Sequence, residues 1–97
     1  MGHIAKKILI IADKSCNFFA LKKLFERFEV EIVKVFAINE ALDKAEKYDF
    51  ALVIIDKQMS NNDIYTELNL LYGSENSKHV PVIIFIDEYP EHHYSLK

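Results

Sequence analysis

The sequence has few cysteines, few glycines and no long apolar run, and each shortage excludes a class of protein. A single cysteine, Cys16, cannot form an internal disulfide framework, which fits a protein of the reducing cytoplasm. No glycine lies in the segment 8–13, so neither a dinucleotide-binding fingerprint nor a P-loop is expected there. The apolar stretch before Asp13 is too short for the core of a signal peptide or a membrane span.

A concentrated positive charge is also missing. Lysine and arginine number 12 against 15 acidic residues, the net charge is -3, and no basic block occurs. Direct nucleic-acid binding by this segment is therefore not expected. What is present is an apolar content of 51% with 7 Phe and 5 Tyr, enough for one hydrophobic core. We expect one soluble globular domain over residues 1–97.

Three apolar segments rich in Ile and Val, residues 8–12, 50–55 and 80–86, predict buried strands. They are apolar at consecutive positions, which is typical of strands in a parallel sheet covered on both faces. Residues 30–36 alternate in part with charges and predict an edge strand. Helical spacing lies between these segments. We expect N-caps at Ser15 and Asn39, a third helix from Asn62-Asp63 to Gly73, and a core stripe of Phe18, Leu21, Leu24, Phe25 and Phe28.

The alternation of strand and helix predicts an α/β fold with an open, doubly wound parallel sheet. Ligands of such sheets bind beyond the carboxyl ends of the strands. Asp13, Asp56 and Asp87 each follow a predicted strand at that edge. An Asp there can simply start a turn, at about even odds for any one position. Carboxylates gathered at one edge would repel one another, and Mg²⁺ is the expected companion.

The segments KILIIAD (7–13), YDFALVIIDKQM (48–59) and VPVIIF (80–85) resemble the first, third and fourth strands of response-regulator receiver domains. The resemblance covers nearly the whole chain in order and spacing, and Asp63 seven positions after Asp56 is part of its most distinctive segment. It implies a flavodoxin-like three-layer sandwich with strand order 2-1-3-4, in which the family's fifth strand and last helix are missing.

The resemblance also implies a site. Asp56 matches the phosphoacceptor aspartate, Asp13 one of two metal-binding acids, and Gln58 the residue whose backbone carbonyl completes the Mg²⁺ site. The implied partner is a sensor histidine kinase or a phosphotransfer protein in a cytoplasmic two-component phosphorelay. Enzyme activity is expected to be limited, at most, to phosphorylation and dephosphorylation of the receiver's own aspartate.

Several positions depart from the family pattern. Ala12 replaces the first metal-binding acid, Ser60 a common proline and Ile64 a common glycine. Ile86 replaces the Ser or Thr whose hydroxyl reads out the phosphoryl group, and the family's lysine after the fifth strand has no counterpart. Asp87 either repels the phosphoryl group or, as a hypothesis, substitutes for the acid missing at Ala12.

Two functions therefore stay open: a phosphoacceptor receiver, and a pseudo-receiver that acts by protein contacts without phosphorylation. A flavodoxin-like enzyme has little support because no second catalytic group is evident. Without a fifth strand the apolar edge of residues 82–86 would be unpaired, which predicts a homodimer or aggregation through that edge.

Overall fold

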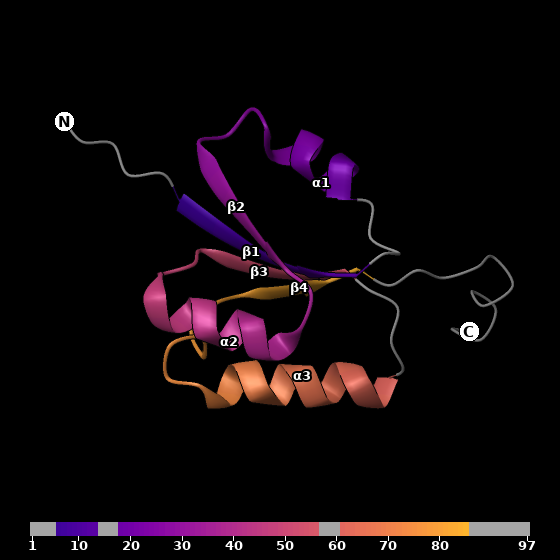
Figure 1. Cartoon of the computed structure of the whole chain (residues 1–97), viewed down its shortest axis with the longest axis vertical. Helices are drawn as coiled ribbons and strands as arrows, with labels where there is room; N and C mark the ends of the chain where they lie inside the picture. Colours follow the sequence, from indigo (N-terminus) through magenta and orange to yellow (C-terminus); the bar gives the residue numbers. More distant parts are fainter. Residues whose placement is uncertain (1–5, 14–17, 57–60, 86–97) are drawn as a thin grey trace, which may run out of the picture.

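The computed structural model describes residues 6–13, 18–56 and 61–85. Strands and helices alternate along this part of the chain, as Figure 1 shows. The elements are β1 (Lys6–Ala12), α1 (Phe18–Phe25), β2 (Val30–Val35), α2 (Ile38–Lys47), β3 (Leu52–Asp56), α3 (Asn61–Gly73) and β4 (Val82–Ile84). Within these ranges, no helix is long and apolar enough to cross a membrane.

The described strands form one parallel sheet in the order β2-β1-β3-β4, so the predicted fold and strand order are confirmed. α1 covers one face of this sheet, while α2 and α3 cover the other (Figure 1). β1 lies between β2 and β3, and its residues from Ile8 to Ile11 are almost completely buried. A strand with helices on both faces needs apolar residues at every position, which explains its uninterrupted Ile and Leu.

The sheet has an apolar cluster on each face because successive side chains of a strand point to opposite sides. Leu9 and Ile11 of β1 pack with Leu71 of α3 on the face that α2 and α3 cover. Ile10 and Ala12 pack with Leu21 of α1 on the opposite face. The two clusters together fix which face each helix must cover.

Fewer apolar residues in and after α1 are buried than the sequence predicts. Leu21 is buried, and Phe18 and Phe25 pack partly against the cluster beneath it. Leu24 and Phe28, however, are 59% and 58% exposed, so their assignment to the core was wrong. Leu24 lies within α1, and Phe28 follows the helix in the turn to β2. Helical spacing identifies apolar positions but cannot tell which of them another element covers.

α2 begins two residues earlier than expected. Its N-cap is Ala37, so Asn39 lies inside the helix and the predicted Asn39 cap was wrong. Alanine has no side-chain acceptor. Glu40 instead supplies one: its Oε1 accepts hydrogen bonds from the backbone N–H of Phe36 at 2.9 Å and of Ala37 at 3.1 Å. This is the carboxylate half of a capping box.

α3 ends in a turn that contains a buried hydroxyl. Ser77 is buried, and its Oγ donates a hydrogen bond to the backbone carbonyl of Leu71 at 2.6 Å. This bond occupies one of the carbonyls that the end of a helix leaves without an intrahelical donor. The sequence predicts only a polar loop over 74–78, so the inward position of Ser77 was missed.

β4 is an edge of the described sheet. The carbonyl of Pro81 accepts from Val53 N at 3.0 Å, and Phe85 N donates to the carbonyl of Ile55 at 2.9 Å. Because peptide groups alternate in direction along a strand, the N–H and C=O groups of Val82 and Ile84 point away from β3. Strand β4 is shorter than the predicted segment 80–86, whose last residue, Ile86, lies outside the described residues.

Candidate functional site

The acidic site is built where two neighbouring strands end. Ala12, the last residue of β1, pairs in register with Asp56, the last residue of β3. Asp13 follows Ala12 directly, so the structure brings Asp13 and Asp56 to the same edge of the sheet on adjacent strands. Both residues are partly buried. The sequence predicted that these two acids lie at the same sheet edge, and the register of β1 and β3 agrees with this.

The residues directly beneath these acids are apolar and completely buried. Ile11 and Ile55, which precede the acidic ends of their strands and pair with each other, have no exposed surface. The carboxylates therefore sit where buried strands reach solvent, with hard oxygen ligands on one side and a packed core on the other. Mg²⁺ binds through one or two carboxylates and keeps several waters, so this pair of side chains fits it.

Ala12 shows what the site lacks. Its side chain is 0% exposed and belongs to the cluster beneath α1. A methyl group thus occupies the position where the resemblance expects the first acid. Within residues 6–13, 18–56 and 61–85, no three His, Cys, Asp or Glu side chains are close enough together to hold a metal ion. Asp13 and Asp56 are the two carboxylates that this part of the chain offers at the strand ends.

Other predicted site residues lie outside the described residues: Gln58, the expected backbone ligand, Asp87, the candidate substitute acid, and Ile86, at the switch position. Their roles stay predictions. Asp63 is described, and it lies exposed in the first turn of α3. A carboxylate there is favoured by the partial positive charge of the helix N-terminus, so this residue has a structural explanation.

Two exposed phenylalanines border the same edge of the sheet and were missed as surface features. Phe36 follows β2 and Phe85 follows β4, the two outer strands of the described sheet. The ammonium of Lys34 lies 5.1 Å from the ring centroid of Phe36 and 4.8 Å from that of Phe18. A phenylalanine is ordinarily expected in the core. The signal that could have indicated exposure is that each of these two residues directly follows an outer strand of the sheet.

The fold matches a solved receiver domain, although the sequence finds no relative. No protein-family model matches the chain, and no curated protein matches its sequence significantly. One similar solved structure is the receiver domain of a sensor histidine kinase from Pseudomonas aeruginosa PAO1, with a magnesium ion coordinated in its active-site cleft. The TM-score is 0.72 at 17% identity, over 95% of this chain and 75% of that one. The chain thus has the fold of a response-regulator receiver domain.

Proposed function

We propose that this chain is a phosphoacceptor receiver domain of a cytoplasmic two-component phosphorelay, with Asp56 as the acceptor. The observation that carries the proposal is the register of β1 and β3, which puts Asp13 beside Asp56 at the carboxyl edge of a sheet with the receiver fold. Ligands of open parallel sheets bind at this edge. The donor is the phosphohistidine of a sensor histidine kinase or a phosphotransfer protein.

The chemistry is a phosphoryl transfer between two protein side chains. A carboxylate oxygen of Asp56 attacks phosphorus, the P–N bond to the donor histidine breaks, and the imidazole nitrogen leaves with the electron pair and takes up a proton. The product is an acyl phosphate on Asp56. Asp56 is only partly buried at the end of its strand, so it remains accessible from solvent.

Magnesium would be held by Asp13, Asp56 and the backbone carbonyl of Gln58, with Asp87 as a candidate further ligand. A magnesium ion bound by these residues would neutralise charge on the incoming phosphoryl oxygens. In the related receiver structure a magnesium ion is coordinated in the active-site cleft. With alanine at position 12, we expect this chain to bind Mg²⁺ more weakly than a receiver that has both acids.

The test is to label the intact chain with acetyl phosphate and Mg²⁺ and to measure its mass. We expect one added phosphoryl group, lost in Asp56→Asn and when EDTA removes the metal. Asp49→Asn is the matched control, because Asp49 is exposed at the opposite end of β3. Label that persists in Asp56→Asn would refute Asp56 as the acceptor.

A second function, a pseudo-receiver that acts through protein contacts alone, is favoured by the buried methyl group of Ala12. It predicts no added mass under conditions that label an ordinary receiver, and binding of partners that is the same for wild type and Asp56→Asn. The labelling experiment therefore separates the two functions.

We also propose self-association through the side of β4 that no described strand pairs with. The outward N–H and C=O groups of Val82 and Ile84 offer a template for another strand, and no charged side chain interrupts residues 81–85. Exposed apolar strand edges of this kind pair with other chains. A second copy of β4 is the proposed occupant.

A further inference from the structure

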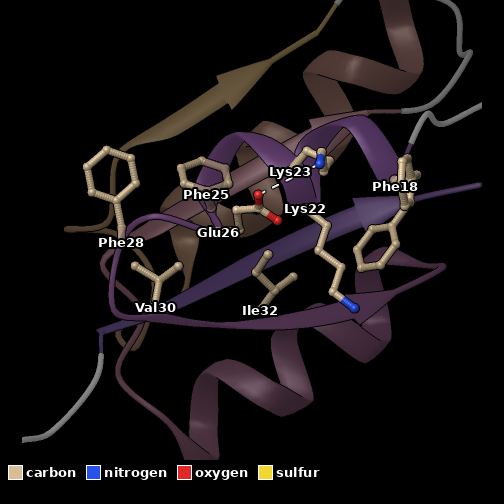
Figure 2. A pocket seen from close by; sticks show the side chains of 9 residues that line it. Phe18, Lys22, Lys23, Phe25, Glu26, Phe28, Val30 and Ile32 are labelled. Atoms are coloured by element: carbon tan, nitrogen blue, oxygen red, sulfur yellow. Dashed lines mark ion pairs between the residues drawn. The ribbon is translucent and has the colours of Figure 1, made fainter.

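A groove of about 410 Å³ lies between α1 and β2, on the face of the sheet opposite α2 and α3. Figure 2 shows its side chains, which come from the helix, the turn after it and the outer strand. Its apolar wall is formed by Phe25, Phe28, Val30 and Ile32. This volume lies within the range of pockets that bind small molecules.

The end of the groove near Phe18 is cationic. Lys22 lines the groove, and in Figure 2 its side chain extends from α1 toward β2, between Ile32 and Phe18. The ammonium of Lys34, two residues beyond Ile32 on the same face of β2, lies 4.8 Å from the ring centroid of Phe18. Among the residues that the structure describes, neither lysine has a carboxylate partner.

The remaining charges of the groove largely cancel. Lys23 and Glu26 form an ion pair at 3.8 Å, drawn as the dashed line in Figure 2. Lys22 is therefore left as the uncompensated charge of the lining, and Lys34 adds a second ammonium group against the ring of Phe18. An apolar wall at one end and two ammonium groups at the other match a ligand with a hydrocarbon tail and one anionic head.

We propose that this groove binds a medium-chain fatty carboxylate. Its tail lies along Phe25, Phe28 and Val30, where it removes exposed aromatic surface from water. Its carboxylate lies at the Phe18 end between the ammonium groups of Lys22 and Lys34. This site is on the α1 face of the sheet and does not depend on phosphorylation of Asp56.

The experiment titrates the ¹⁵N-labelled full chain with dodecanoate below its micellar concentration and follows backbone amide shifts. We expect saturable shifts confined to α1, the following turn and β2. Dodecanol, which has the same chain without the charge, should bind about tenfold more weakly. Lys22→Gln and Lys34→Gln should each lower the affinity about two- to fivefold, within the range of one exposed ion pair.

Two further variants make the test specific. Lys47→Gln removes the same charge from the end of α2, on the other face of the sheet, and should leave the affinity unchanged. Phe28→Ser removes part of the apolar wall at an exposed position, so the fold should survive while binding weakens. Equal affinity for dodecanol and dodecanoate, unchanged binding in both the Lys22 and Phe28 variants, or no saturable shifts at all would each overturn the proposal.

Discussion

Ala12 is the residue that most limits the acidic site. Its methyl group is buried beneath α1, while its neighbours Asp13 and Asp56 reach the edge of the sheet. A carboxylate at position 12 would add a metal ligand close to these two acids. This carboxylate would also be largely withdrawn from water. Burying a charge without a partner typically costs several kcal/mol of stability.

We therefore predict opposite effects of Ala12→Asp on metal binding and on stability. The variant should bind Mg²⁺ more tightly than wild type, and without metal its Tm should fall, by ~4–8 °C for each kcal/mol lost. Mg²⁺ should restore part of that loss because it binds the folded state. Thermal melts in EDTA and in excess Mg²⁺ measure this. Ala51→Asp, exposed at the opposite end of β3, is the control, and a metal-independent Tm in Ala12→Asp would contradict the prediction.

Ser77→Ala tests the hydrogen bond at the end of α3. The substitution removes the Oγ that donates to the carbonyl of Leu71 in a buried position, so stability should fall by about 1–2 kcal/mol. Urea unfolding followed by circular dichroism measures the change. Ser74→Ala, in the same turn but less buried, should cost clearly less, and equal losses would show that the bond itself contributes little.

For single residues, the sequence predicted the positions of the acids at the strand ends better than it predicted which polar side chains are buried. Asp13 and Asp56 could be placed because a parallel sheet brings the ends of its strands together, whatever the details of packing. Ser77 could not, since a serine in a polar segment carries no sign that its hydroxyl turns inward to a helix carbonyl. Glu67, buried on α3, was missed for the same reason.

Among the elements, α2 has an N-terminus stabilised by a side chain within the helix. We predict that Glu40→Ala lowers stability by about 0.5–1 kcal/mol, because the N–H groups of Phe36 and Ala37 lose their shared acceptor. Glu40→Gln keeps an acceptor oxygen and should retain most of the stability. Denaturant midpoints of the two variants give the comparison, and a Gln variant as unstable as the Ala variant would point to charge rather than the bonds.

The strands could be predicted as elements because consecutive Ile and Val residues indicate burial on both faces. Helix boundaries were less accurate. The pattern around Asn39 suggested an ordinary cap, but the N-cap is Ala37, where Glu40 accepts hydrogen bonds from the backbone N–H groups of Phe36 and Ala37. For α1, helical spacing also predicted burial of Leu24 and Phe28, but Leu24 is exposed on the helix and Phe28 is exposed in the turn that follows it.

For the whole molecule, the two faces of the sheet are covered unequally. Among the described helices, α2 and α3 lie over one face, while α1 lies over the other, above β1 and β2 (Figure 1). Ile83 and Phe85, at the far side of the sheet, are correspondingly exposed. The α/β fold followed from the alternation of elements, and the strand order from the resemblance to receiver domains. Whether the chain self-associates depends on how the outer side of β4 is covered, and the order of strands and helices along the sequence does not predict this.

The two edges of the described sheet differ in how they resist pairing. β2 carries Glu31 and Lys34, and Glu31 forms an ion pair with Lys7 of β1 at 3.0 Å. Charges on an edge strand oppose pairing with another chain. β4 has the sequence Val-Ile-Ile, follows a proline and has no such charge. Self-association is therefore expected at β4 and not at β2.

Ile83→Lys tests this assembly. Ile83 is 45% exposed in the middle of β4, so a lysine fits there without entering the core, and in a paired edge two such charges would be brought together. We expect wild type to dimerise with rising concentration in sedimentation velocity, and Ile83→Lys to weaken the dimer at least about tenfold, the effect of ~1.4 kcal/mol. Leu70→Lys, 44% exposed on α3, adds the same charge away from the edge and should dimerise like wild type. A wild-type chain that stays monomeric at high concentration, or a Leu70 variant as weak as the Ile83 variant, would contradict pairing through β4.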